Sequence, residues 1–266
     1  MSTVAADAWA AGDAYEPYIG RWSRRVAREF LAWLAAPPGG RWLDVGCGTG
    51  ALTQAILDAA APAHVEGVDP SEAYVGYARG RVRDPRATFV VADARALPQA
   101  DESIDVAVSG LALNFVPQPE TAVAEMARVV RAGGTVAAYV WDYADRMQLI
   151  RVFWNAAVAL DPAAAELDEA RRFPICDPAA LEELFRGTGL QGVESRAIDV
   201  PTRFRDFDDY WSPFLGGQGP APGYAMGLDE ERRAALRERI RVALPVAADG
   251  SIELVARAWA VRGARG

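Results

Sequence analysis

The chain has 266 residues, a length that accommodates one domain with insertions as readily as two domains. Hydrophobic residues make up 51% of it and charged residues 24%, which is ordinary for a globular protein and excludes disordered and fibrous classes. The formal net charge of -8 disfavours a broad phosphate-binding surface, so we expect no nucleic-acid partner.

Residue usage limits the chemistry further. The two cysteines, Cys47 and Cys176, are too few for a metal site, and we expect neither a metal nor a disulfide. All 28 basic residues are arginine, so no lysine can act as a base or form a Schiff base. No apolar run approaches the roughly 18 residues of a membrane span, and the N-terminus does not resemble a secretory signal. We therefore expect a cytoplasmic protein with no membrane partner.

The N-terminal part changes character at Tyr15. Residues 1–14 are small and alanine-rich, which predicts a loose arm. Apolar and aromatic residues then recur at spacings of three and four, which predicts an amphipathic helix that ends at Pro37 to Gly40. Its second half suits packing on a core, whereas Tyr15 to Trp22, around Gly20, suit a mobile cover over a ligand. The residues on this helical face are Tyr15, Tyr18, Trp22, Val26, Phe30 and Trp33.

Leu43 to Gly50, reading Leu-Asp-Val-Gly-Cys-Gly-Thr-Gly, is the most informative stretch. It joins a predicted strand, Arg41 to Val45, to a predicted helix, Ala51 to about Ala60. Glycines allow positive φ and a close backbone approach, and N–H groups at a helix N-terminus favour negative charge. The pattern predicts a nucleotide-type site; the alternative is an ordinary strand-to-helix turn without a ligand.

The glycine spacing distinguishes two kinds of site. A dinucleotide-binding fold requires G-x-G-x-x-G, whereas Gly46, Gly48 and Gly50 form G-x-G-x-G. With Asp44 two residues earlier, the octapeptide resembles the first motif of the class I S-adenosylmethionine-dependent methyltransferases. The resemblance implies that S-adenosylmethionine contacts this turn and an N-terminal cover. The implied cofactor residues here are Asp44, Gly46, Cys47, Gly48, Tyr18 and Arg21, with Trp22 toward the substrate.

The second predicted strand, Val65 to Val68, ends in Asp69-Pro70-Ser71. Asp69 follows the glycine turn by about 20 residues, where an acid can accept both hydroxyls of a ribose. The alternative role of a helix N-cap is filled well by Ser71, which also belongs to the expected cofactor site. His64 precedes this strand, at the amino edge of the sheet, so we expect it to be structural.

Two more strands add candidates. The strand Ala87 to Ala92 leads to Asp93-Ala94-Arg95-Ala96-Leu97-Pro98, which resembles the family's adenine-contacting segment; Asp93 would accept the amino hydrogens, although a turn acid is the alternative. The strand Ile104 to Ser109 ends at a further candidate, Ser109. The following Gly110-Leu111-Ala112 departs from the acid or amide and two prolines of DNA amino methyltransferases, which weakens the nucleic-acid interpretation.

Strand and helix signals alternate as far as the strand Thr135 to Trp141, which leaves Asp142 and Tyr143 at its tip. This alternation predicts an α/β fold with a doubly wound, mostly parallel, seven-stranded Rossmann-like sheet that binds ligands at the carboxyl ends of its strands. The last strand, Ile252 to Val261, lacks a crossover helix and is expected to be antiparallel.

The remaining segments are predicted insertions. Phe204 to Tyr224 combines aromatic residues with Gly216 to Gly219, which suggests an acceptor lid; a static cap or a homodimer contact is the alternative. If it is a lid, Tyr210 and Trp211 contact the substrate. The expected divisions are an arm and cover helix (1–40), a cofactor core (41–142), a helical insertion (143–178), a core continuation (179–200), a cap (201–250) and the last strand (251–266).

The resemblance covers Trp42 to Tyr143 and is similar to the branch that includes the ubiquinone and menaquinone biosynthesis enzymes. It implies a methyltransferase acting on an O, N or C nucleophile of a small molecule. Transfer from a sulfonium needs alignment and exclusion of water more than a base. If a base is used, Asn114, Asp142 and Tyr143 are the catalytic candidates. The alternatives are an S-adenosylmethionine-binding module without catalysis and, disfavoured by the glycine spacing, a nicotinamide oxidoreductase.

Overall fold

The computed structural model of the protein describes residues 16–216 and 219–266. The predicted arm over residues 1–14, Tyr15, and Gly217 and Gln218 of the predicted lid lie outside the described residues. The described residues form two compact units. The sheet unit contains residues 22–141, 175–198 and 258–266, and the cap unit contains residues 16–21, 142–174 and 199–257.

A seven-stranded sheet confirms the predicted fold class. Its order is β3-β2-β1-β4-β5-β7-β6. Strands β1 to β5 pair in parallel, and β7 runs antiparallel to β5, as the missing crossover helix predicted. The strands are β1 (Arg41–Val45), β2 (His64–Asp69), β3 (Ala87–Val91), β4 (Ile104–Gly110), β5 (Val130–Trp141), β6 (Gln191–Phe204) and β7 (Ile252–Ala264).

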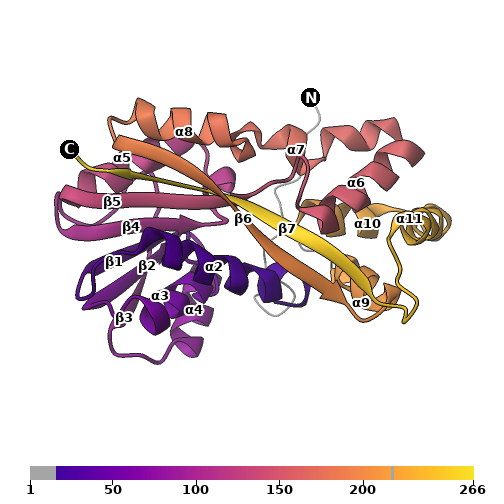
Figure 1. The fold of residues 1–266 in the computed structure, drawn as a ribbon, viewed down its shortest axis with the longest axis horizontal. Coiled ribbons are helices and arrows are strands. Elements are labelled where there is room, and N and C mark those ends of the chain that lie inside the picture. The colour runs from indigo at the N-terminus through magenta and orange to yellow at the C-terminus, as the bar shows by residue number, and fades with distance from the viewer. Residues whose placement is uncertain (1–15, 217–218) are drawn as a thin grey trace. The chain divides into compact units, whose positions relative to one another are not determined.

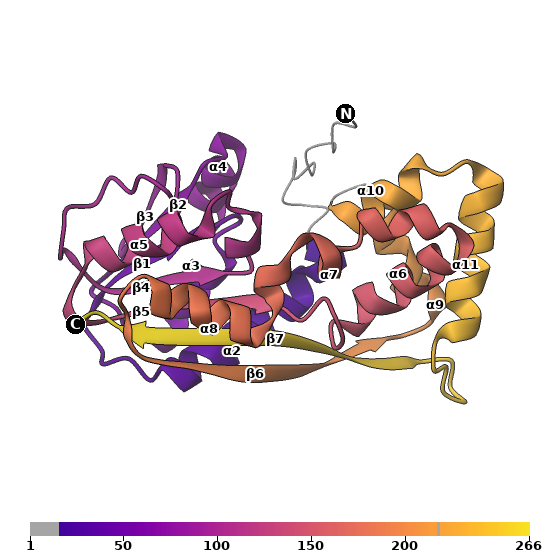
Figure 2. The same ribbon diagram turned by 90° about the horizontal axis from the view of Figure 1, so that it is seen from above.

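Helices cover both faces of the sheet. In Figure 1, α5 and α8 lie on one side of the strands and α2, α3 and α4 on the other, and Figure 2 shows α5 and α8 from above. The predicted helical stripe holds in α2, where Val26 and Phe30 are buried and the Phe30 ring lies 4.7 Å from that of Tyr139. The bounds are α2 (Arg21–Leu34), α3 (Ala51–Ala59), α4 (Glu72–Arg81), η2 (Leu113–Phe115), α5 (Pro119–Val129), η4 (Pro174–Cys176) and α8 (Pro178–Gly187).

The largest differences from the predicted strand bounds are in β5, β6 and β7. β5 begins at Val130 and not at Thr135, because Val130 pairs with Ile104 ahead of an irregular register. β7 continues past Val261 to Ala264, which pairs with Thr135. β6 runs from Gln191 to Phe204 and so continues past position 200, the end of the predicted core continuation. Backbone pairing needs no apolar side chain, so strand bounds predicted from hydropathy alone were too short.

The cap unit is mostly helical. Its elements are η1 (Glu16–Gly20), α6 (Gln148–Leu160), η3 (Pro162–Glu166), α7 (Glu169–Arg172), α9 (Phe207–Trp211), η5 (Ser212–Gly216), α10 (Pro220–Gly227) and α11 (Glu230–Ala243), together with parts of β6 and β7. The predicted insertions 143–178 and 201–250 fall largely within it. None of the described helices has both the length and the apolar character needed to cross a membrane.

Most aromatic residues of Phe204 to Tyr224 lie in the interior of the cap unit. Tyr210 is 0% exposed and Trp211 4%, and the Phe214 ring stacks on Phe153 at 4.7 Å. The Tyr210 hydroxyl donates to the backbone oxygen of Leu149. These side chains are therefore packed, unlike the accessible contact surface expected of a lid, because α9, η5 and α10 fold them inward. Substrate contact by Tyr210 and Trp211 stays a prediction.

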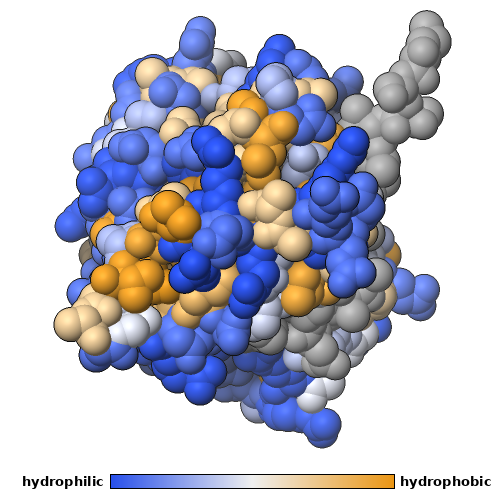
Figure 3. Space-filling view, turned by 90° about the vertical axis from the view of Figure 1, so that its right-hand side faces the viewer, coloured by the Kyte–Doolittle hydropathy of each residue, from blue (hydrophilic) through white to orange (hydrophobic). Residues whose placement is uncertain are grey.

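The exposed large hydrophobic side chains of the cap unit come from other positions. On the face seen in Figure 3, hydrophobic areas are interrupted by hydrophilic side chains, a pattern typical of a solvated surface. The homodimer contact that the sequence left open as the alternative to a lid stays a prediction. The exposed large hydrophobic residues in the described part of this unit are Leu160, Leu167, Leu215, Met226, Val242 and Val246.

One carboxyl lies inside the aromatic interior of the cap unit. Glu169 is 2% exposed, and its Oε2 accepts a hydrogen bond from Nε1 of Trp154. Burial raises the pKa of Glu169 to about 8, and the Trp154 hydrogen bond opposes this shift. Next to it, Asp168 accepts from Arg151, whose guanidinium also donates to the backbone oxygen of Tyr143. The carboxyl of Glu169 is therefore protonated at neutral pH.

We expect the stability of the cap unit to fall as pH rises toward 8. The folded pKa of Glu169 lies above its ordinary 4.5, so the folded state holds the extra proton; the contribution is complete below pH 4.5 and lost as pH passes about 8. A loss of a few kcal/mol should appear in urea unfolding followed by tryptophan fluorescence. Glu169→Gln should reduce this slope, whereas Glu231→Gln, an exposed control on α11, should keep it. An unchanged slope in Glu169→Gln would contradict the assignment.

Candidate functional site

The turn between β1 and α3 requires its glycines. Gly46, Gly48 and Gly50 have φ values of 76°, 51° and 78°, a left-handed region that suits glycine. A Cβ at Gly46 would also lie 2.5 Å from the Cβ of Ala112. The turn is therefore fixed both by its own conformation and by the loop that follows β4.

The N–H groups of this turn are used within the protein. The N–H groups of Gly46 and Cys47 both donate to the backbone oxygen of Val68. The Gly50 N–H donates to the backbone oxygen of Cys47, and the Gly48 N–H donates to the carboxylate of Asp69. The sequence predicted N–H groups exposed for a negatively charged ligand, and for these four that expectation is wrong. They instead fasten the turn to the end of β2.

Asp69 ties two loops together at the end of β2. Its Oδ2 accepts from the Gly48 N–H at 3.0 Å, and its Oδ1 accepts from the Ser71 N–H at 2.9 Å. Burial raises the pKa of Asp69, and these two hydrogen bonds oppose the shift. Each carboxylate oxygen can accept more than one hydrogen bond, so Asp69 retains capacity for the hydroxyls of a ribose.

Asp44 supplies a buried carboxylate oxygen with no partner. The side chain is 1% exposed; its Oδ2 accepts from the Thr53 hydroxyl at 2.7 Å, whereas Oδ1 has no hydrogen-bond partner among the described residues. Burial raises the pKa of Asp44 to about 7; hydrogen bonds from Thr53 lower it, and the charge of Asp69 raises it. An orphaned buried acid requires either a proton or a cation.

The third acid, Asp93, is more exposed. It follows β3 and forms an ion pair with Arg95, whose Nη2 lies 2.6 Å from Oδ2. Hydrogen bonds from Arg95 hold the pKa of Asp93 at about 2. Asp93 is therefore ionised at neutral pH, and its predicted contact with adenine would share the carboxylate with Arg95.

The other expected cofactor residues surround these acids. Ser71 is the N-cap of α4, and its hydroxyl accepts from the Tyr74 N–H, which confirms the predicted cap. Cys47 and Ala94 are buried, and burial raises the pKa of the Cys47 thiol, which stays protonated. Ser109 is buried in β4, one residue before the strand ends. Their contacts with a cofactor stay predictions.

The chain beyond β4 passes close to the glycine turn. Leu111 has a φ of 60°, an uncommon conformation for a bulky residue, and Ala112 then packs against Gly46. Asn114 follows in η2; it is 8% exposed, and its Nδ2 has no partner among the described residues. Strained backbone and an unsatisfied amide at one loop are typical of a ligand site.

The candidates at the tip of β5 belong to the cap unit. Asp142 accepts from the Asp145 N–H, so its carboxylate caps a turn. Tyr143 is buried, and its ring lies 6.1 Å from that of Phe173. These contacts are structural, and the catalytic roles predicted for both residues stay predictions.

The predicted cover residues divide between the two units. Tyr18 and Arg21 belong to the cap unit, where Tyr18 packs edge-on against Phe214 and Arg21 pairs with Asp209 at 3.3 Å. Trp22 is buried at the start of the sheet unit's part of α2. The described contacts of Tyr18 and Arg21 thus attach the cover segment to the cap, and their roles toward a cofactor stay predictions.

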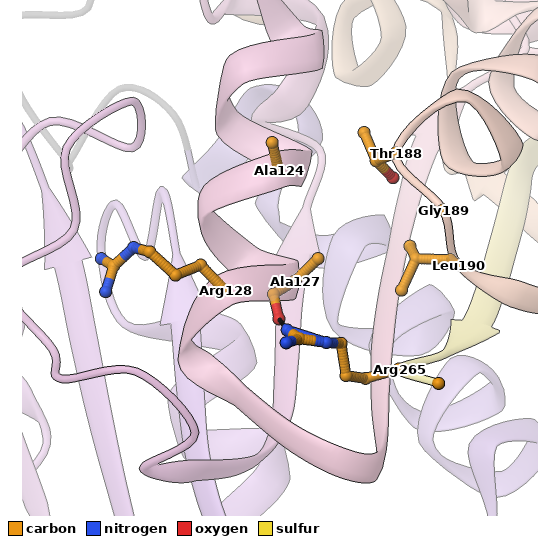
Figure 4. Close-up of a pocket in the computed structure, with 8 residues that line it drawn as sticks. Ala124, Ala127, Arg128, Thr188, Gly189, Leu190 and Arg265 are labelled. Atoms are coloured by element: carbon orange, nitrogen blue, oxygen red, sulfur yellow. Dashed lines mark hydrogen bonds between the residues drawn. The ribbon is translucent and has the colours of Figure 1, made fainter.

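A pocket of about 360 Å³ lies elsewhere in the sheet unit, beside α5 and the loop after α8 (Figure 4). The two arginine side chains that line it interact with other groups of the protein: Arg128 pairs with Glu125 and Asp101, and Arg265 donates to the backbone oxygen of Ala127. Arg265 also lies beside Gly134, at the start of β5. This pocket is therefore at the opposite edge of the sheet from the acids.

Sequence reasoning missed the residues that support the site. Thr53 holds Asp44, Ala112 closes on Gly46, and a Cβ at Gly67 would meet the Phe89 ring at 2.6 Å. Thr53 could have been identified from the sequence, because it is the third residue of the predicted helix that follows the glycine turn. Ala112 and Gly67 carried none, because their importance comes from contacts distant in sequence.

Known proteins share the sequence of this region. Residues 43–138 match the family described as Methyltransferase domain. The demethylmenaquinone methyltransferase of Roseiflexus sp. (strain RS-1) is 34% identical over 183 residues, which are 63% of this chain and 75% of that protein. The trans-aconitate 2-methyltransferase of Variovorax paradoxus is 30% identical over 200 residues, covering 65% of this chain and 76% of that protein.

A solved structure shares the fold. Phosphoethanolamine N-methyltransferase 2 of Haemonchus contortus, in complex with phosphomonomethylethanolamine and S-adenosylhomocysteine, has a TM-score of 0.60 at 17% identity. The match covers 95% of this chain and 56% of that one. At this identity the likeness concerns the fold.

The residues of the sheet unit fit S-adenosylmethionine. The Asp44 oxygen without a partner suits a cationic group, Asp69 suits a ribose, and the glycines leave no side chain in the way. A cationic ligand would stabilise the negative charge of the two buried carboxylates. A phosphate would be repelled by the same carboxylates. The site chemistry therefore agrees with a positively charged nucleoside.

We expect Asp69→Ala to weaken S-adenosylmethionine binding roughly ten- to a hundredfold, because lost hydrogen bonds to a buried sugar cost about 1.5 to 3 kcal/mol. Calorimetry on the folded variant measures this. Asp58→Ala, which removes an exposed acid of α3 that accepts a hydrogen bond from Gln54, is the control and should bind like the parent. Equal affinity of the Asp69 variant and the parent would refute the assignment.

We also expect S-adenosylmethionine affinity to rise with pH up to about 7. Below its pKa, Asp44 must release a proton before it can accept a cation, so the dissociation constant should fall by up to tenfold per pH unit there and level off above it. Titrations between about pH 5.5 and 7.5 measure this. Asn at position 44 cannot ionise, so Asp44→Asn should bind weakly with a flat profile. A sloping profile in that variant would assign the titration to another group.

Proposed function

Because this chain belongs to the class I S-adenosylmethionine-dependent methyltransferases, we propose that it methylates an O, N or C nucleophile of a small molecule. The observation that carries the acceptor class is the kinship with two enzymes whose names specify demethylmenaquinone and trans-aconitate, both small molecules. The net charge of -8 and the departure of Gly110-Leu111-Ala112 from the DNA enzymes support an acceptor other than nucleic acid.

The chain's own contribution to transfer is positioning. S-adenosylmethionine supplies an activated methyl group when bound, so the barrier depends on alignment of the nucleophile and on exclusion of water. Asp44, Asp69 and the glycine turn would hold the cofactor at the carboxyl ends of β1 and β2. No histidine or lysine stands at this edge, which agrees with transfer that relies on proximity.

A methyl-transfer screen tests the proposal. The protein is incubated with S-adenosylmethionine and a panel of phenols, carboxylic acids, amines and carbon acids, and products are read by mass spectrometry alongside release of S-adenosylhomocysteine. We expect one class to gain a methyl group. Gly46→Ala should abolish transfer because its Cβ would collide with Ala112, whereas Gly76→Ala, which has open space on α4, should retain it.

Two outcomes would contradict the proposal. The first is tight S-adenosylmethionine binding by the parent with no methylated small molecule in any class, which would favour a binding module without catalysis. The second is preferential methylation of transfer RNA or of a protein added to the same reactions.

A further inference from the structure

Asn114 is a buried amide whose hydrogen-bonding capacity is unused. It lies in η2, directly after the loop in which Ala112 packs on Gly46. Nδ2 is inaccessible to solvent and has no partner among the described residues. Leaving a buried amide unsatisfied costs about 1 to 3 kcal/mol. The second asparagine of the chain, Asn155, is exposed and accepts a hydrogen bond from Nε of Arg151.

The sheet order separates this amide from the residues expected to hold the nucleoside. Asp44, Asp69 and Asp93 stand at or just beyond the ends of β1, β2 and β3, which are consecutive in the sheet. Asn114 follows β4, on the other side of β1. Ligands of such sheets lie across the strand ends. A nucleoside over β1 to β3 therefore leaves the β4 side for the molecule that receives the methyl group.

The chemistry of the amide limits its role. A carboxamide does not titrate in the accessible pH range, so Asn114 is no general base, although the sequence left that open. Its NH₂ group can only donate hydrogen bonds, so its partner must be an acceptor. An oxygen atom can accept, whereas a protonated amine cannot. A fixed donor near a reacting oxygen stabilises negative charge on it.

We propose that the Asn114 amide donates a hydrogen bond to an anionic oxygen of the methyl acceptor, which assigns the acceptors to phenolates, enolates and carboxylates. This inference rests on the proposed small-molecule function and deepens it. During transfer, the oxygen or its conjugated carbon forms a bond to the methyl carbon, the sulfonium bond breaks, and its electron pair stays on sulfur, leaving S-adenosylhomocysteine. Asn114 orients the acceptor and gives up no proton.

The kinetic experiment compares three variants on matched probes. The probes are 1,4-naphthoquinol and trans-aconitate, which carry acidic oxygens, and histamine, an amine. We expect the parent to prefer an oxygen probe and Asn114→Ala to lower its kcat/KM about a hundredfold, with the pH profile unmoved. Asn114→Asp should be lower still, because a carboxylate repels an anion. Asn155→Asp, whose carboxylate can still accept from Arg151, should match the parent.

A binding experiment gives a readout without turnover. The protein loaded with S-adenosylhomocysteine is titrated with the same oxygen probes in a calorimeter, and Asn114→Ala should weaken the preferred probe at least tenfold while melting at the parent's temperature. The S-adenosylmethionine affinity of the variant should stay within about twofold of the parent's.

Each opposite result has its own meaning. A parallel loss of S-adenosylmethionine affinity would overturn the inference by assigning Asn114 to the cofactor's carboxylate. Parent-like kinetics and binding in Asn114→Ala, or a parent that prefers histamine, would also overturn it while leaving the proposed function standing. If the parent methylates no small molecule and binds no oxygen probe, both the proposed function and this inference fail.

Discussion

The cofactor edge of the sheet depends on the two hydrogen bonds that Asp69 accepts from Gly48 and Ser71. One carboxylate thereby fixes the turn after β1 and the start of α4 in a single geometry. The Gly46 and Cys47 amides add two bonds to the end of the same strand, at Val68. The glycine turn is thus held before any ligand arrives, and binding need not order it.

The electrostatics of this edge distinguish it from a phosphate site. The amides of Gly46, Cys47, Gly48 and Gly50 make hydrogen bonds within the protein, and the groups that retain hydrogen-bonding capacity are the buried carboxylates of Asp44 and Asp69. Burial raises the pKa of Asp44 and Asp69 because it destabilises their ionised forms. A positive charge that enters the site therefore stabilises both carboxylates. A sulfonium nucleoside brings that positive charge, whereas the two carboxylates would repel the negatively charged pyrophosphate of a dinucleotide.

The cap unit is a second compact unit with a core of its own. It collects three separated segments around a buried aromatic interior that contains Phe153, Tyr210 and Phe214. The matched domain, residues 43–138, lies wholly outside it. Since one fold serves many acceptors, we propose that individual groups such as Asn114 select the acceptor. The stability of the cap unit depends on its own packing and on the protonation of Glu169.

The sequence by itself determined the sheet, its antiparallel last strand, and the acids at the strand ends, because strand and helix periods and glycine spacing are local properties of the chain. It also identified Asn114 as a polar group after β4, without saying that the amide is unsatisfied. Tertiary structure alone decided that Ala112 closes on Gly46 and that Thr53 holds one oxygen of Asp44 and leaves the other free. It also turned Tyr210 and Trp211 inward, since burial depends on what packs against a residue from elsewhere in the chain.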